Sequence, residues 1–464
     1  MDRRRRCCPS LVGGSPVRRT ALTSALIACW AGWLLGAAGA QPASPALVIF
    51  DEVAHHLRVA YGGAAPTHPS QLLPTARAAL SERCAGRPDC PDEAGVAALD
   101  GVLAELGDPH TRLIAAADVA RMTREGGDDD EPRVIGVIVR APLDGLGLVV
   151  IEAVPGSAAA HAGLERGDRI VAVDGVFLPA DFRERLAILE AAVAGGRLRV
   201  TVLRTGAQPF EVDLVAGPVP RERPPSLTWV ADGVGWLRIP SLLPAEVVIA
   251  TVHRLVDEAA SAGARALIVD LRDNLGGSYQ AVVAVAGAFE ASCGRLFAGP
   301  MVGFGLRCDD GVLRVVDPFG RTQVSDRLPL VALWTGELVV LVNAQTLSCA
   351  ESLASELQRR AGARVVGEVT AGLANTAVQM LPLSNGMRLV LTVATVYDLD
   401  GSPLPPRVTP DVFVRDDPLR LAEGHDDPLE AALDLLEPPR REWVRPAPAS
   451  RSRSSNRAAT WRRG

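Results

Sequence analysis

A serine that opens a predicted helix is the first residue whose setting suggests chemistry. Ser348 follows the apolar run 338–342 and comes three residues before Glu351, where a helical pattern over 350–360 begins. The unpaired N–H groups and the dipole of a helix N-terminus favour negative charge, which suits an acyl-transfer nucleophile. A serine at this place also commonly caps a helix, so a purely capping role is the alternative.

A Gly-Gly turn supplies the second chemical feature. Residues 270–277 read Asp-Leu-Arg-Asp-Asn-Leu-Gly-Gly and continue a strand pattern at 266–271. Because glycine has no Cβ, the N–H groups of such a turn can face a developing oxyanion. We expect the N–H of Cys349 and that of Gly276 or Gly277 to be the oxyanion donors.

The third segment, 367–379, reads Gly-Glu-Val-Thr-Ala-Gly-Leu-Ala-Asn-Thr-Ala-Val-Gln. Together the three segments resemble the C-terminal processing (tail-specific) peptidases, a family related to the core of the tricorn protease. The resemblance implies that Ser348 is the nucleophile and that Gln379 orients a general base, although this loop is two residues longer than the family pattern. The family's base is a lysine, and Leu373 stands in its place.

The general base is therefore the open question, because the sequence contains no lysine at all. A serine needs a group that accepts its proton, an effect worth about 10²–10⁴-fold, and arginine cannot accept one. The tricorn branch uses a histidine from the segment before its PDZ-like domain, and His110 within Asp108-Pro109-His110-Thr111 is the matching candidate. The same tetrapeptide pattern also occurs in lysine-bearing relatives.

Two functions remain open at this point. One is a serine endopeptidase that uses His110 or another non-lysine base, and the other is a pseudopeptidase that keeps only a peptide-binding role. The glutamate that assists in the tricorn branch is missing, since Leu404, Pro405 and Pro406 precede Pro410-Asp411. Cys349 as the nucleophile is a weaker third possibility, because free cysteines are commonly buried. The remaining histidines that we considered are expected on the surface: His161, His253 and His425.

Short strand patterns and turns between 133 and 217 predict a small β-domain. Their order, with Pro155-Gly156-Ser157-Ala158 before one helix and a Gly-rich turn at 163–168 after it, resembles a PDZ domain. Such a domain adds a peptide as an extra strand and captures its terminal carboxylate on backbone N–H groups. The resemblance implies that the peptide-binding residues are Val134, Ile135, Gly136 and Val137. A β-domain used only for packing is the alternative.

These elements predict a multidomain α/β (α+β) protein of 464 residues. The strands and helices of the last large segment alternate, which is typical of a core with parallel strand pairing. The expected parts are a signal peptide at 1–40, an N-terminal helical segment at 45–122, a PDZ-like domain at 133–217, a peptidase-like α/β core at 226–416 and a disordered tail at 437–464.

Export is indicated by the first forty residues, which combine arginines, an apolar run and the small-x-small site Ala38-Gly39-Ala40. An uncleaved membrane anchor is the alternative. In an oxidising compartment we expect the disulfides Cys84–Cys90 and Cys293–Cys308, with Cys349 left over, although all five could be ordinary thiols.

The composition of the chain limits the kinds of molecule that it is expected to bind. The net charge of −6 and the lack of a basic stripe in the body of the chain argue against nucleic acid. No cysteine pair has metal-ligand spacing with histidine, so we expect no metal and no cofactor. The expected partner is a polypeptide with a free C-terminal tail, and the oligomeric state stays open.

Overall fold

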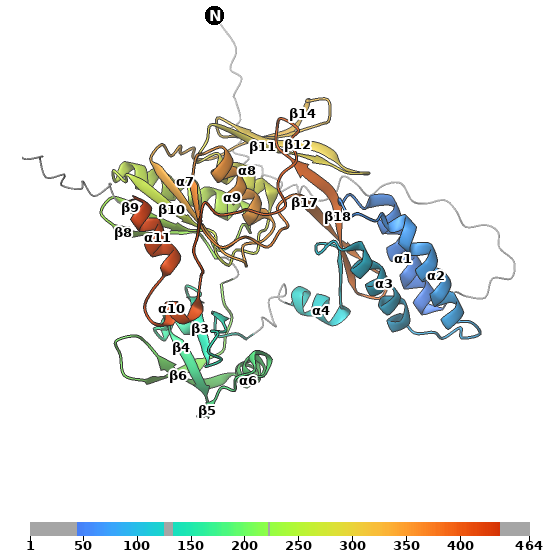
Figure 1. Cartoon of the computed structure of the whole chain (residues 1–464), viewed down its shortest axis with the longest axis horizontal. Coiled ribbons are helices and arrows are strands. Elements are labelled where there is room, and N and C mark those ends of the chain that lie inside the picture. The colour runs from blue at the N-terminus through green and yellow to red at the C-terminus, as the bar shows by residue number, and fades with distance from the viewer. Residues whose placement is uncertain (1–43, 125–132, 221–222, 437–464) are drawn as a thin grey trace, which may run out of the picture. The chain divides into compact units, whose positions relative to one another are not determined.

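The computed structural model describes residues 44–124, 133–220 and 223–436 (Figure 1). The expected signal peptide and C-terminal tail lie outside the described residues. No helix among those described is long and apolar enough to cross a membrane.

The N-terminal helical segment is a three-helix unit with its own apolar core. Leu57, Leu99 and Leu106 are completely buried in it. The chain enters the first two helices through prolines, which fit the first helical turn because their missing N–H would be unpaired there anyway. The helices lie side by side in Figure 1: α1 (Pro45–Ala60), α2 (Pro69–Arg83) and α3 (Asp92–Leu106).

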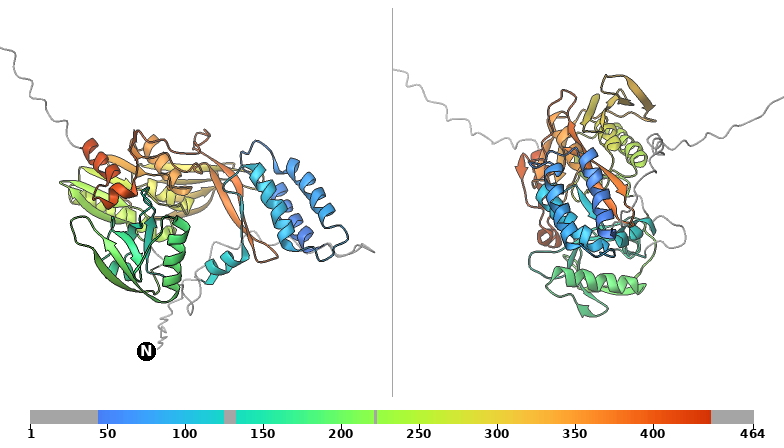
Figure 2. Two further views of the ribbon diagram at one scale, coloured as in Figure 1. Left: turned by 60° about the horizontal axis from the view of Figure 1, so that its bottom comes forward. Right: turned by 90° about the vertical axis from the view of Figure 1, so that its right-hand side faces the viewer.

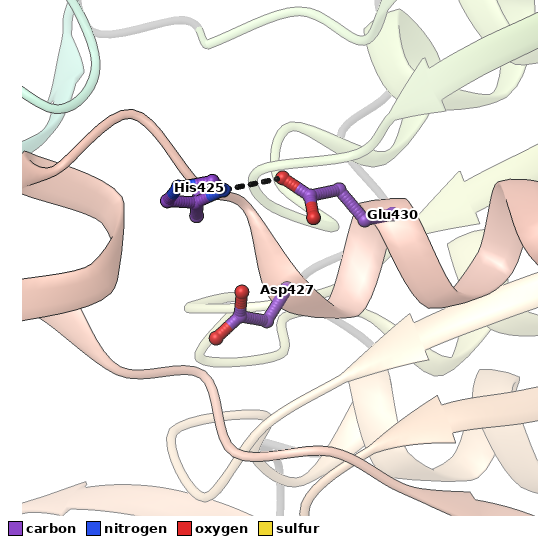
Figure 3. A group of neighbouring side chains, drawn as sticks. All are labelled: His425, Asp427 and Glu430. Carbon is purple, nitrogen blue, oxygen red and sulfur yellow. Dashed lines mark ion pairs between the residues drawn. The ribbon is translucent and has the colours of Figure 1, made fainter.

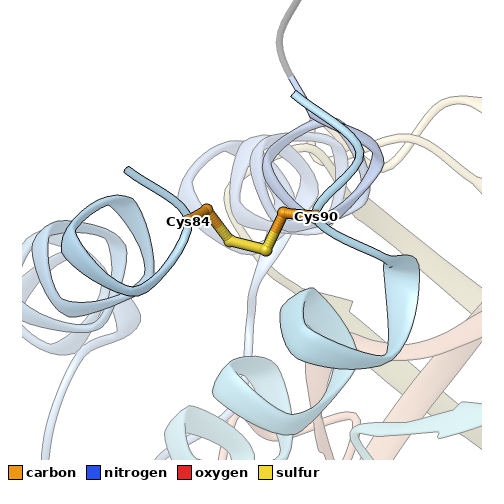
Figure 4. Close-up of a disulfide and its surroundings, with 2 residues drawn as sticks. All are labelled: Cys84 and Cys90. Atoms are coloured by element: carbon orange, nitrogen blue, oxygen red, sulfur yellow. A yellow bond between two sulfur atoms is a disulfide. The ribbon is translucent and has the colours of Figure 1, made fainter. Parts of the chain in front are cut away.

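The Cys84–Cys90 disulfide closes the connection between α2 and α3, which confirms the first predicted pairing (Figure 4). The second pairing is wrong, because Cys293 and Cys308 are free, buried thiols. They lie directly opposite each other on paired strands rather than in an exposed loop, and the Cys293 thiol donates to Val283 O at 3.0 Å. Sequence spacing revealed their proximity but not that both thiols belong to the apolar core.

The PDZ-like domain is a six-stranded sheet in the order β2-β3-β4-β6-β7, with β5 paired to β4. Strand β2 is an edge strand, as peptide addition would require. The strands of the domain are β2 (Val137–Arg140), β3 (Leu148–Ala153), β4 (Arg169–Val173), β5 (Val176–Phe177), β6 (Arg197–Leu203) and β7 (Phe210–Val215), and its helices are α5 (Ala158–His161) and α6 (Phe182–Ala194).

The core contains a mostly parallel sheet in the order β19-β16-β15-β10-β9-β8, in which only β8 runs antiparallel to its neighbour. Its central strands are apolar on both faces, because helices cover both. Helices α7 (Ala245–Ser261), α8 (Tyr279–Ala286) and α9 (Cys349–Arg359) pack on one face and α11 (Asp427–Leu436) on the other. The strands are β8 (Ser226–Ala231), β9 (Val234–Arg238), β10 (Ala266–Asp270), β15 (Glu337–Val342), β16 (Arg364–Gly367) and β19 (Val412–Phe413).

A second, antiparallel sheet joins the core to the N-terminal segment. The short strand β1 (Arg112–Ile114) pairs with β18 (Arg388–Tyr397), which also pairs with β11 and β17. The left view of Figure 2 shows the long β17–β18 ribbon reaching the N-terminal helices, and Leu389 and Leu391 of β18 belong to their apolar core. The other elements are α4 (Ala116–Arg124), β11 (Ser292–Ala298), β12 (Gly303–Asp309), β13 (Val312–Val316), β14 (Thr322–Arg327), β17 (Thr376–Pro382) and α10 (Pro418–Ala422).

His253 corrects a sequence expectation. It is buried on α7 instead of lying on the surface. Its Nε2 bonds to Ala284 O at 3.0 Å, and its Nδ1 accepts from Ala332 N at 3.1 Å. Both ring nitrogens thus satisfy backbone groups of neighbouring segments, a partnership that no local sequence pattern reveals.

Candidate active site

The three chemical segments follow three neighbouring parallel strands. The Gly-Gly turn comes after β10, Ser348 after β15 and the 367–379 segment after β16, and these strands are adjacent in the sheet. Parallel strands end at the same edge, where loops from a sheet of this kind form ligand sites. The topology therefore brings together three motifs that are separated by up to a hundred residues.

Ser348 is held in a strained backbone conformation. It has φ 56° and ψ −120° immediately before α9. A positive φ is uncommon for residues other than glycine and costs about 1–3 kcal/mol, so the surrounding structure must impose it. Strained strand-to-helix turns of this kind present a nucleophile at the edge of a sheet. Ser348 and Glu351 also form a capping box at the start of α9.

Glu351 ties the Ser348 turn to the loop after β16. Its fully buried carboxylate accepts from Ser348 N at 2.8 Å, Gly372 N at 2.7 Å and Leu373 N at 2.8 Å, and also from the Thr370 hydroxyl. A buried carboxylate is tolerated when hydrogen bonds satisfy it in this way. This carboxylate therefore fixes the position of Leu373 relative to the serine.

The Gly-Gly turn lies against the serine. A Cβ on Gly276, which has φ 96°, would sit 2.9 Å from Leu347 O and 3.1 Å from Ser348 Cβ. Gly276 N donates to Asn274 Oδ1 at 2.8 Å, so this amide already has a partner. Among hydrogen bonds between described residues, none is donated by Gly277 N or Cys349 N. Of the expected oxyanion donors, these two amides are the ones without an intramolecular acceptor.

The Cys349 side chain is built into the core. Its thiol is buried and donates to Gly277 O at 3.3 Å. Burial raises the pKa of Cys349 to about 12, which keeps the thiol protonated and poorly nucleophilic. The geometry gives no support to a cysteine nucleophile.

The loop that carries a lysine in the resembling family is held in place but lacks a basic group at Leu373. Tyr279 fixes its far end, with its hydroxyl 3.1 Å from Ala374 O and 3.2 Å from Thr376 O. Sequence reasoning missed both Tyr279 and Asn274. Asn274 lies within the 270–277 motif, whereas nothing in the sequence singled out Tyr279.

His110 precedes β1 and is buried against the start of β17. Its Nδ1 lies 2.5 Å from Thr376 Oγ1, and no hydrogen bond between described residues joins it to Ser348. Burial lowers the pKa of His110, an effect that Asp108 partly opposes. The imidazole is therefore neutral at neutral pH and able to accept a proton.

Gln379 lies on β17, opposite Leu391 of β18, and is exposed. The structure gives no hydrogen bond from its side chain to another described residue. A register shift between Ala377 and Val378 precedes it, in the longer part of the loop. The structure thus assembles Ser348, Gly276, Gly277 and Cys349, whereas His110 and Gln379 have no direct hydrogen bond to them.

The expected carboxylate-binding loop of the PDZ-like domain precedes the edge strand β2. Gly136 has φ 74°, and a Cβ there would lie 2.2 Å from Ser157 Cβ. The packing of the domain itself therefore requires a glycine at position 136. The loop's other end is anchored where Val134 pairs with Gly217.

One group of described residues has metal-ligand proximity. His425, Asp427 and Glu430 lie together at the start of α11, with His425 Nδ1 3.4 Å from Glu430 Oε1 (Figure 3). Both Asp427 oxygens accept hydrogen bonds from Arg420, so a guanidinium already neutralises this carboxylate. We assign no metal to the group.

Comparison with known proteins agrees with the geometry. Residues 233–414 match peptidase family S41, and residues 149–204 match the PDZ domain. The carboxyl-terminal-processing peptidase 1 of Arabidopsis thaliana chloroplasts is 30% identical over 66% of this chain. The alignment spans 61% of that relative's length, less than two thirds. The carboxyl-terminal-processing protease of Synechocystis is 28% identical over 77% of this chain and 80% of its own.

A crystal structure of a putative S41 protease from Bacteroides fragilis shares the fold, with a TM-score of 0.53, 15% identity and coverage of 88% of this chain and 99% of that one. Family model, relatives and fold agree with the three motifs at one sheet edge. Residues 233–414 are thus those of a peptidase family S41 domain, residues 149–204 are those of a PDZ domain, and the relatives that this chain resembles are carboxyl-terminal processing peptidases.

Proposed function

We propose that this chain is an endopeptidase that cleaves polypeptides with Ser348 as its nucleophile. The observation that carries the proposal is the strained conformation of Ser348 beside the Gly276–Gly277 turn. The hydroxyl attacks the scissile carbonyl, and the amides of Gly277 and Cys349 stabilise the oxyanion.

His110 is our candidate for the general base. We assign the tautomer in which Nδ1–H donates to Thr376 Oγ1, because only then does Nε2 keep a lone pair. A base oriented by a third group is the usual arrangement for activating a serine. The proton would pass from Ser348 to Nε2 directly or through bridging water. Gln379, on the same strand as Thr376, would help to position that water.

Cleavage of an unfolded protein by wild type, Ser348→Ala and His110→Ala tests this proposal. We expect both substitutions to lower turnover to a similar level, because members of one catalytic unit are not additive. Equal rates for wild type and Ser348→Ala would refute it. If Ser348→Ala loses cleavage but His110→Ala keeps full activity, His110 is not the general base and Ser348 remains the proposed nucleophile.

The second candidate is a pseudopeptidase, and Leu373 is the observation that favours it. A site that lacks a base would keep its peptide groove and bind tails without cutting them. The two candidates differ in one result, since the pseudopeptidase has no serine-dependent turnover to lose.

Under either candidate we propose that the PDZ domain binds the free C-terminal tail of a polypeptide along β2. The support is the edge position of β2 and the preceding loop 134–137. Peptides with apolar, free C-termini should bind at least about tenfold more tightly than their amidated forms. Equal affinities would refute carboxylate capture. Substitution of Gly136 is unsuitable as a test, because it disturbs the contact with Ser157.

We further propose that the protein is exported to the periplasm or the cell exterior. The Cys84–Cys90 disulfide is compatible with this, since such bonds persist in oxidising compartments. N-terminal sequencing of the exported protein should begin near Gln41, and recovery of an intact Met1 would contradict cleavage.

A further inference from the structure

A cavity of ≈ 350 Å³ separates the PDZ domain from the mostly parallel sheet of the core. We call it the interdomain cavity. The PDZ domain contributes Glu152 and Arg166, the core contributes Trp236 and Arg238, and the connecting segment contributes Arg223. None of the residues assigned above to catalysis or tail binding lines it.

Positive charge outweighs negative charge on its described lining. The carboxylate of Glu152 serves two guanidiniums, since both Arg223 and Arg238 pair with it. The other lining carboxylate, Glu165, pairs with Arg204 and is largely exposed.

Arg166 adds a third guanidinium. Its partner Asp426 lies 3.1 Å away and is shared with Arg272, which approaches to 2.6 Å. Burial, followed by the charges of Arg272 and Arg238, lowers the pKa of Arg166. Crowded cations of this kind are relieved by an additional anion.

Arg238 belongs to the cavity lining, and its Nη2 pairs with Glu152 at 2.9 Å. Its Nε is buried and makes no hydrogen bond, so Glu152 does not satisfy the whole guanidinium. The same cavity has apolar walls, formed by Ile151, Leu164, Pro155, Pro224 and Pro240.

We propose that the interdomain cavity binds a small organic carboxylate, whose oxygens accept from Arg238 and Arg223 and whose alkyl part contacts the apolar walls. The apolar lining favours an organic anion over a bare oxyanion. Because its walls come from both parts of the chain, the ligand stabilises the contact between the PDZ domain and the core. This site does not depend on Ser348 or on peptide cleavage.

Calorimetric titration of the whole chain with hexanoate tests the site, with hexanamide as its neutral counterpart. We expect hexanoate to bind at least about tenfold more tightly than hexanamide, because only the carboxylate can pair with guanidinium. Arg238→Gln should weaken hexanoate binding by about tenfold or more, and the more exposed Arg223→Gln by severalfold. Arg199→Gln is the control, since Arg199 lies on the exposed surface of the PDZ domain and pairs with Asp213.

Absence of hexanoate binding, or equal binding of hexanamide, would overturn the proposal. So would an equal effect of Arg199→Gln and Arg223→Gln. Binding of inorganic phosphate without hexanoate would overturn the organic class of ligand. If circular dichroism shows that Arg238→Gln is unfolded, Arg223→Gln alone decides between these outcomes.

Discussion

The two halves of the proposed active site differ in how completely they are built. The attacking half comprises the Ser348 turn and the Gly276–Gly277 turn, and it has strain, unpaired amides and close packing. The proton-accepting half comprises the candidate base His110 and the loop after β16. Glu351 anchors this loop, which carries Leu373 where the family that this chain resembles has its lysine. Among the described residues, no hydrogen bond joins His110 to Ser348. The backbone geometry of the attacking half is therefore present although the family's usual proton-accepting side chain is absent.

Glu351→Ala should have the largest effect, because this carboxylate is shared by both halves. It leaves the amides of Ser348, Gly372 and Leu373 without their acceptor, and each buried unsatisfied donor costs about 1–3 kcal/mol. We expect loss of cleavage together with a lower urea midpoint of unfolding. An active and equally stable variant would show that the two halves are not coupled through this residue.

Leu373→Lys should change the proton-accepting half alone. The backbone at 373 is already fixed by Glu351, so an amine there should approach Ser348, and we expect cleavage to rise by about 10²-fold. Leu373→Met, which has similar reach and no amine, is the matched control. An increase with methionine, or none with lysine, would mean that more than the side chain at 373 limits turnover.

The pH dependence of cleavage sharpens the comparison further. A base must be unprotonated, and burial holds the pKa of His110 below its usual 6.5. Activity should thus persist through pH 6.5 and decline only at lower pH. His110→Ala should abolish this acid limb along with most of the rate. An unchanged limb in that variant would assign it to another group.

The smallest expected effect is on the pH dependence of stability, and it comes from Glu290, which follows α8 and lies near Glu356 of α9. Burial and the neighbouring Glu356 carboxyl raise the pKa of Glu290 to about 8. The folded state therefore holds this proton more tightly than the unfolded state, so the free energy of unfolding falls as the pH rises from about 4.5 to about 8.

Glu290→Gln cannot ionise, and its stability should fall less over that range than that of wild type. Urea unfolding at pH 5 and pH 8.5 measures the difference, with the exposed Glu246→Gln as control. Parallel pH profiles for wild type and Glu290→Gln would contradict the buried carboxyl pair.

Much of the attacking half could be predicted from the sequence, because its motifs are local. A strand followed by Gly-Gly, and a strand followed by serine and a helix, are short patterns whose geometry the backbone dictates. The alternating strands and helices of the core were accessible for the same reason.

The rest depends on contacts between distant segments. The sequence could not show that His110 meets Thr376, that Tyr279 holds the loop at 374–376, or that His253 is buried between helices. The error over Cys293 and Cys308 has the same origin. The spacing of the two cysteines is compatible both with a loop closed by a disulfide and with two paired strands. Only the packing of α8 decides the environment of the thiols.

The central claim is that Ser348 is a reactive nucleophile although no lysine is present to activate it. A serine-directed fluorophosphonate, followed by mass spectrometry of peptides, tests this without any assumption about the substrate. We predict a covalent adduct on Ser348 in the folded wild type, none after denaturation and none in Ser348→Ala. Absence of an adduct on Ser348 in the folded protein would contradict the claim and leave the peptide-binding pseudopeptidase.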